Sequence, residues 1–331
     1  MRRSRTCFNP RWPGAFKGSN SAAGGVLLVV LTLLLSSPGA TATPQQLSAP
    51  VQTATLSKQS RHIGDSTWSW YEGGSGPTLV LVHGFASSKD TWLSMGQRLS
   101  ARFHVVIPDL PGWGESSRVP GASYNIVQQS DRLGSFVEDL NLRDVTVVGH
   151  SMGGAISGVF AAEHPQRVAG LVLISPQGVS FTENDFMRLL SSGANPFVYQ
   201  DRAGVENMAR WVYLNPPVFT DKKIEQLVAE NTVNSAFIDL TLKEILPASQ
   251  MFALDSRLAK LSIPVLGIGC ETDKVIDRSA FTFLSRGLVN APSKEMVMLE
   301  GCNHLPMQER SFAVEQLLES RIEQALADNA R

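Results

Sequence analysis

Short runs of aliphatic and β-branched residues recur along most of the chain, and stretches with helical periodicity separate them. The runs are continuously apolar, which is typical of strands buried on both faces of a parallel sheet. They lie at 79–82, 105–107, 145–148, 171–174, 265–268 and 296–299. The helical stretches lie at about 90–101, 125–140, 152–163 and 306–327. This alternation predicts an α/β fold with a doubly wound, mostly parallel sheet.

Ahead of these runs, the pattern is different. Residues 57–63 and 67–72 alternate polar and apolar positions on either side of Gly64 and Asp65. Alternation around such a turn predicts an antiparallel hairpin that precedes the parallel strands. We therefore expect the core of the fold to comprise residues 57–177 and 249–331.

The interval 178–248 contains no buried-strand run. It holds helical stretches near 183–192, 203–213 and 221–231, and it would follow the sixth strand. Ligands of α/β sheets bind at the carboxyl ends of the strands, and helices inserted between two strands can cover that edge. We therefore expect a helical cap or lid. Its Trp211, Tyr213, Leu214, Val218 and Phe219 are expected either to form a small core of the cap or to line an apolar channel.

The first 42 residues resemble a targeting segment. They carry five basic residues and no acid, then an apolar run at 26–35, and small residues at Ala40 and Ala42. The run is short for a membrane span, which needs roughly 20 residues. We expect a cleaved signal peptide in a secreted or periplasmic protein, or an uncleaved N-terminal membrane anchor. A linker at 43–56, rich in Pro, Gln, Ser and Thr, follows.

Charge and cysteine content narrow the possible partners. The net charge of the full sequence is −1. Without the five basic residues of the leader, the chain has 24 Lys and Arg and 30 Asp and Glu, which gives a net charge of −6. No basic stripe is visible, which argues against a nucleic-acid partner. Histidines and cysteines are too scattered for a zinc site, so no metal or organic cofactor is expected. Outside the leader there are two cysteines, Cys270 and Cys302, which form either a disulfide or two buried thiols.

The clearest chemical signal is the sequence Gly-His-Ser-Met-Gly at 149–153. It comes directly after a predicted buried strand and directly before a predicted helix. A G-x-S-x-G sequence in that context is the nucleophile elbow, in which glycines permit a sharp turn and the serine hydroxyl projects from it. Ser151 is therefore the expected nucleophile. The N-terminus of the following helix favours a developing negative charge beside it.

A serine nucleophile needs a base and an acid that orients the base. Of the six histidines, His304 lies in a loop between the last strand and the final helix, where this architecture supplies the base. The loop after the preceding strand offers three acids. Asp273 has the most suitable position, while Asp277 and Glu271 remain alternatives. The expected triad is Ser151, His304 and Asp273.

An oxyanion hole requires two N–H donors. The backbone of Met152, next to the nucleophile, is one expected donor. Phe85, in the loop after the strand 79–82, is the other; Gly84 lets that loop approach closely, and the His83 side chain is expected to brace it.

Taken together, these motifs resemble the α/β-hydrolase superfamily over roughly residues 65–325. The matching segments are 83–85, 108–116, 149–154, Asp273 and 301–304. Segments 195–197 and 213–219 look like the cap of Moraxella/Psychrobacter-type lipases and related membrane-anchored phospholipases A. Two features depart from the superfamily pattern. Asp277 stands where a proline is usual, and the two cysteines are not standard.

The resemblance implies a serine hydrolase that cleaves lipid or smaller acyl esters through an acyl-enzyme, with membrane contact through the cap or the N-terminal segment. Ser151 excludes the relatives that use an aspartate nucleophile, and Phe85 differs from the tryptophan expected in the oxyanion loop of peroxidases of this fold. A phospholipase A, a C–C bond hydrolase of the same fold and a non-catalytic binding homologue remain alternatives, since fold alone does not fix function.

Overall fold

An eight-stranded sheet forms the centre of the computed structural model, which describes residues 55–329. The strand order is β1-β2-β4-β3-β5-β6-β7-β8. The pairs β1–β2 and β2–β4 are antiparallel, and all the others are parallel. The prediction of a mostly parallel α/β-hydrolase sheet preceded by a hairpin is thus confirmed. The strands are Ser57–Ile63, Ser66–Gly73, Thr78–Val82, His104–Pro108, Val145–His150, Val168–Ile174, Val265–Cys270 and Lys294–Leu299.

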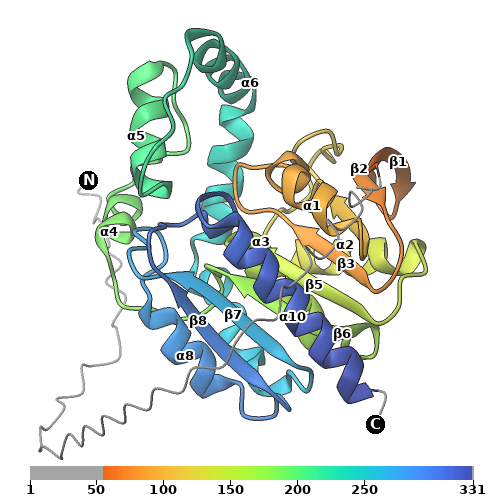
Figure 1. The fold of residues 1–331 in the computed structure, drawn as a ribbon. Helices are drawn as coiled ribbons and strands as arrows, with labels where there is room; N and C mark the ends of the chain where they lie inside the picture. The colour runs from red at the N-terminus through yellow and green to blue at the C-terminus, as the bar shows by residue number, and fades with distance from the viewer. Residues whose placement is uncertain (1–54, 330–331) are drawn as a thin grey trace, which may run out of the picture. The chain divides into compact units, whose positions relative to one another are not determined.

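Helices cover both faces of this sheet (Figure 1). Successive residues of β3 point to opposite faces, as the geometry of a strand requires. Leu79 and Leu81 pack with residues of α1 (Leu93–Leu99) and α10 (Ser311–Asn329). Val80 and Val82 belong to the cluster that includes residues of α2 (Ile126–Asp139), α3 (Met152–Glu163) and α8 (Ser279–Gly287). Burial on both faces explains why the strand sequences are continuously apolar.

Between β6 and β7 the chain forms the helices α4 (Asp185–Ser191), α5 (Arg202–Val212) and α6 (Asp221–Ile245). We call residues 178–248 the insertion. Figure 1 shows α5 and α6 projecting from the sheet at one end. The sequence predicted α6 only to residue 231, because the residues that follow, Thr232 to Ser235, have low helix propensity. Its second half buries Phe237, Ile238, Leu242 and Ile245 and continues the helix.

The remaining elements are short connections. They are η1 (Lys89–Trp92), η2 (Pro165–Arg167), α7 (Ala248–Met251), η3 (Asp255–Lys260) and α9 (Pro306–Glu309). The predicted leader at 1–42 and most of the predicted linker lie outside the described residues. Within 55–329 no helix has both the length and the apolar character that crossing a bilayer requires.

Candidate active site

Ser151 occupies a strained turn between β5 and α3. Its φ of 53° and ψ of −120° lie in a region that residues with a side chain rarely adopt. A hydrogen bond to the end of β6 holds the turn in place, because the Ser151 N–H donates to the Ile174 carbonyl at 3.0 Å. Its own carbonyl accepts from Gly154 N at 2.8 Å and from Gln177 N at 3.0 Å. This is the local geometry expected of a nucleophile elbow.

The glycines beside Ser151 are required by close contacts. A Cβ at Gly149 would lie 2.4 Å from the Gly153 carbonyl oxygen, and a Cβ at Gly153 would lie 2.4 Å from the His83 carbonyl oxygen. Neither distance is sterically possible for a side chain. Glycine at both positions therefore lets α3 begin directly against the end of β3.

His304 and Asp273 form a buried pair. His304 Nδ1 lies 3.2 Å from Asp273 Oδ1 and 3.1 Å from Oδ2, and the two side chains are 6% and 2% exposed. The N–H groups of Val275 and Ile276 each donate to Asp273 Oδ1 at 2.9 Å. Burial opposes ionisation of this carboxyl, but the charge and hydrogen bond of His304 and the N–H of Ile276 outweigh it and lower the pKa of Asp273. Asp273 is thus held as a carboxylate beside the imidazole.

The other two acids of this loop point elsewhere. Asp277 Oδ1 accepts from Ser279 N at 2.9 Å, at the start of α8. Glu271 is ion-paired with Arg278 at 2.6 Å. Of the three predicted candidates, the structure pairs Asp273 with His304.

His150 supports the backbone of His304. The His150 Nε2–H donates to the His304 carbonyl at 2.8 Å, and the ring centroids are 4.9 Å apart. Burial, reinforced by the nearby His304 ring, lowers the pKa of His150 to about 3. His150 is therefore neutral at neutral pH and acts as a fixed hydrogen-bond donor. The sequence places it within the elbow but gives no sign of this role.

Phe85 and Met152, the two predicted oxyanion-hole donors, belong to the loop after β3 and to the start of α3. Met152 is the first residue of α3. Phe85 follows Gly84, where a Cβ would lie 2.9 Å from His150 Nδ1 and 3.2 Å from Ser151 Cβ. The loop after β3 thus passes directly beside the elbow.

Two contacts join the loop after β3 to the loop after β4. His83 Nε2 accepts from Leu110 N at 3.1 Å, as the predicted bracing role requires. Lys89 Nζ is buried and lies 2.6 Å from Asp109 Oδ2 and 2.7 Å from Glu115 Oε2. Burial would lower the pKa of Lys89, but hydrogen bonds to both carboxylates raise it above its ordinary value. The buried Lys89 cation, held between these two acids, therefore fixes the loop after β4 against the segment after β3.

Cys270 and Cys302 form a disulfide, with their Cα atoms 5.5 Å apart. The sequence left this pairing open. Cys270 ends β7, three residues before Asp273, and Cys302 lies two residues before His304. The bond therefore cross-links the two loops that carry the Asp273–His304 pair.

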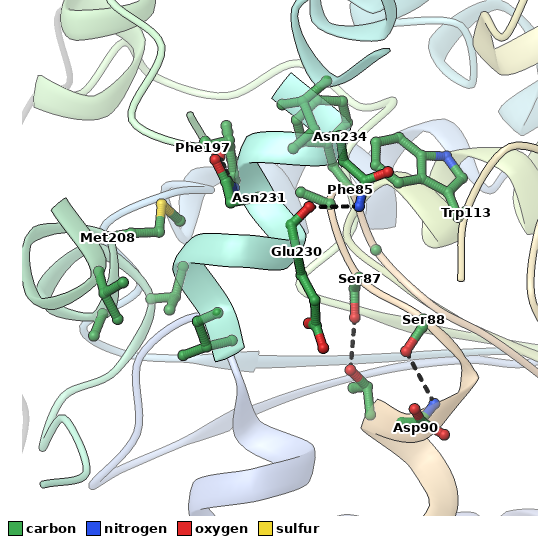
Figure 2. Close-up of a pocket in the computed structure, with 18 of the residues that line it drawn as sticks. Phe85, Ser87, Ser88, Asp90, Trp113, Phe197, Met208, Glu230, Asn231 and Asn234 are labelled. Carbon is green, nitrogen blue, oxygen red and sulfur yellow. Dashed lines mark hydrogen bonds between the residues drawn. The ribbon is translucent and has the colours of Figure 1, made fainter. Parts of the chain in front are cut away.

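Ser151 and His304 both line a pocket of about 790 Å³ between the core and the insertion. Figure 2 shows part of its wall, with Met208 and Trp113 on opposite sides. The apolar lining includes Phe85, Trp113, Phe197, Val205, Met208, Val212, Leu227 and Ile238. The polar lining includes Ser87, Ser88, Asp90, Thr91, Lys223, Glu230 and Asn234.

The apolar side chains of the insertion have two predicted roles, a small core of the cap or the lining of a channel, and the structure shows examples of both. Trp211 packs against Phe186 with ring centroids 5.2 Å apart, inside the insertion. Tyr213 and Phe219 line the pocket. Val218 is fully exposed. Some of these residues therefore serve as a local core and others face the cavity or solvent.

Comparison with known proteins places this geometry in a family. The profile of the alpha/beta hydrolase fold matches residues 77–310. The chain belongs to this family. Among relatives of this α/β-hydrolase, the monoacylglycerol lipase abhd6-B of Xenopus laevis is 30% identical over 247 residues, which cover 72% of each chain. Lipase 3 of Moraxella sp. (strain TA144) is 29% identical over 239 residues, covering 71% of this chain and 74% of the relative.

A solved structure gives a similar result. The crystal structure of a membrane phospholipase A, described as a bacterial virulence factor, has a TM-score of 0.77 at 30% identity, covering 82% of this chain and 86% of that chain. The resemblance to Moraxella-type lipases and membrane phospholipases A is thus confirmed. The names of these relatives indicate that the chain is a carboxylic ester hydrolase.

Proposed function

We propose that this α/β-hydrolase cleaves carboxylic esters of lipids, with Ser151 as nucleophile, His304 as general base and Asp273 as the acid that orients it. The observation that carries the proposal is the buried His304–Asp273 pair on the wall of a pocket that Ser151 also lines. The strained elbow at Ser151 and the names of the relatives, lipases and a phospholipase, support it.

In the proposed mechanism, His304 takes the Ser151 proton as the hydroxyl oxygen attacks the ester carbonyl. The N–H groups of Phe85 and Met152 donate to the oxyanion. When the tetrahedral intermediate collapses, His304 gives the proton to the leaving alcohol. Water, deprotonated by His304, then attacks the acyl-enzyme, and His304 returns that proton to the Ser151 oxygen as the acid leaves. Asp273 keeps the imidazole in the tautomer with its proton on Nδ1 and stabilises the charged imidazolium.

The lining of the pocket favours a substrate with one acyl chain and a small polar head, such as a monoacylglycerol. The apolar side chains beside Phe85 and Met208 suit an acyl chain, and the hydroxyls of Ser87, Ser88 and Thr91 suit a glycerol. Two carboxylates, Asp90 and Glu230, and two cations, Arg118 and Lys223, line the pocket, so its charges balance and do not discriminate against a phosphate head group. A phospholipase A activity, as in the similar solved structure, is therefore the second candidate.

We further propose that residues 178–248 act as the cap of this site and contact lipid surfaces. Pro216, Pro217 and Val218 are exposed between Tyr213 and Phe219, which both line the pocket. An apolar segment beside the pocket lining is suited to contact with the surface that presents the substrate. The predicted leader at 1–42 would direct or anchor the enzyme outside the cytoplasm.

The direct test is hydrolysis of chromogenic acyl esters of increasing chain length, with one monoacylglycerol and one phospholipid. Ser151→Ala should lower kcat by roughly 10⁴- to 10⁶-fold. Equal, measurable rates for wild type and Ser151→Ala would contradict the role of Ser151. Ligand binding by wild type without hydrolysis of any substrate would favour a binding homologue. Inactivity on every ester, with cleavage of a vinylogous diketone, would instead support a C–C bond hydrolase.

A further inference from the structure

The loop that carries His304 is hydrogen-bonded to the insertion at the C-terminal end of α5. His304 N donates to the Val212 carbonyl at 3.0 Å. The acid loop reaches the same place, since Lys274 Nζ donates to the Arg210 carbonyl at 3.2 Å. We call residues 210–215 the α5 end segment. Both loops of the proposed triad therefore contact this one piece of the insertion.

Asn303, next to His304, joins three parts of the chain. Its side chain is fully buried. Oδ1 accepts from Lys274 N in the acid loop at 2.8 Å. Nδ2 donates to the carbonyls of Trp211 at 2.8 Å and Tyr213 at 3.1 Å in the α5 end segment. Each polar group of this amide has a partner, and each partner is a backbone atom of a loop near the triad.

Glu309 makes a parallel connection. Its Oε2 accepts from Asn303 N at 2.8 Å. Its Oε1 accepts from Leu214 N at 2.9 Å and Asn215 N at 3.1 Å. The α5 end segment is thus held to the histidine loop from both sides. Charge-assisted hydrogen bonds of this kind are stronger than neutral ones.

We propose that Asn303 is a positioning residue that makes the α5 end segment part of the support of His304. The proposal rests on the proposed function. It follows that this end of the insertion stays docked during turnover, because moving it would break the bonds from Asn303, Glu309 and His304 N and displace the imidazole. A displacement of about 1 Å at a reacting group lowers rates by roughly 100-fold. Substrate entry then depends on movement elsewhere in the insertion.

Two substitutions separate the connections of Asn303. Asn303→Ala removes them all. Asn303→Asp keeps the acceptor for Lys274 N but replaces the donor to Trp211 and Tyr213 by a carboxylate oxygen that repels their carbonyls, so it breaks the link to the insertion and keeps the link to the acid loop. We expect both variants to lower kcat by roughly 10- to 100-fold on an acetyl ester and on a long-chain ester alike, with KM little changed.

The matched control is Asn195→Ala. Asn195 Nδ2 donates to Asp239 at 2.6 Å, and Oδ1 accepts from Phe197 N at 3.0 Å, so its bonds lie wholly within the insertion. We expect it to leave kcat on the acetyl ester unchanged. Thermal melting of each variant, with assays run well below the transition, separates a positioning effect from unfolding. If Asn303→Ala does not fold, Glu309→Gln, which weakens the link on the other side, replaces it.

Wild-type kcat in Asn303→Asp, or a loss confined to KM for the long-chain ester, would overturn the inference and leave the proposed function standing. A wild-type enzyme with no esterase activity would overturn both.

Discussion

At the scale of single residues, Asp273 differs from the two other acids of its loop in what surrounds it. It is buried, accepts two backbone N–H groups and faces His304, whereas Asp277 caps the start of α8. We expect Asp273→Asn to lower kcat by about 10⁴-fold, because the amide favours the wrong imidazole tautomer. Asp277→Asn keeps its acceptor oxygen and should retain activity. Steady-state kinetics of both variants decide between the two acids, and the reverse pattern would exclude Asp273.

His150 predicts a specific pH dependence of stability. Burial, then the nearby His304, lowers its pKa from 6.5 to about 3 in the folded protein. The unfolded chain takes up a proton between these values that the folded protein does not. The contribution of neutral His150 to the free energy of unfolding is therefore fully present above pH 6.5. On acidification below that pH it falls by at most about 1.4 kcal/mol per pH unit.

We expect His150→Gln to reduce this dependence, because glutamine can still donate to the His304 carbonyl but does not titrate. Urea unfolding at several pH values from neutral down to about pH 4.5 measures it. His62→Gln, at an exposed position, should leave the slope as in wild type. Identical slopes for wild type and His150→Gln would show that His150 does not contribute.

The sequence proposes site residues whose chemistry is tied to a motif, and it gives no sign of side chains that contact distant backbone carbonyls. Ser151 and His304 follow from their places after β5 and β8. Asn303 and His150 act by donating to carbonyls of segments far away in the chain. No pattern of side chains reports where a carbonyl will lie, so these contacts become visible only in the folded chain.

At the scale of elements, the strands were predicted well because burial on both faces leaves a continuous apolar run. Two helices were not. The weak helix formers Thr232 to Ser235 interrupt the pattern of α6, so its continuation to Ile245 was missed. The helix α8 was not predicted, since its nine residues follow the acid loop without a distinct N-terminal signal.

The disulfide belongs to this scale, because it joins the loops that follow β7 and β8. Cys270 and Cys302 are separated by 32 residues. Closing a loop of that length stabilises the folded state by roughly 3–4 kcal/mol. We expect the double variant Cys270→Ala/Cys302→Ala to melt several degrees lower by calorimetry, with part of its esterase activity lost.

Reductant supplies the control for that experiment. Dithiothreitol under mildly denaturing conditions should lower the melting temperature of wild type toward that of the double variant, and should not affect the double variant. An unchanged melting temperature in the double variant would mean that the bond contributes little to stability.

At the scale of the whole molecule, the insertion exposes an apolar segment beside the pocket that lies between it and the core. Val218 is 100% exposed there. Transfer of a valine side chain from water is worth about 1.5–3 kcal/mol. We expect Val218→Asp to lower activity on vesicle-bound monoacylglycerol by roughly tenfold and to leave hydrolysis of a soluble acetyl ester unchanged.

Val289 provides the comparison for this prediction. It is 66% exposed in the loop after α8, away from the insertion in the chain. Val289→Asp introduces the same charge and should not reduce activity on vesicles. Equal losses in both variants would indicate a general effect of charge, and no loss in Val218→Asp would remove this segment as a lipid contact.

The cross-link between Cys270 and Cys302 also bears on how the enzyme is obtained. Glutathione keeps cytosolic thiols reduced, so a host that retains the chain in its cytosol would yield protein without the bond. Batches of equal purity should then differ in specific activity according to the redox conditions of production. Export, or oxidative refolding with a glutathione pair, should bring them to a common value.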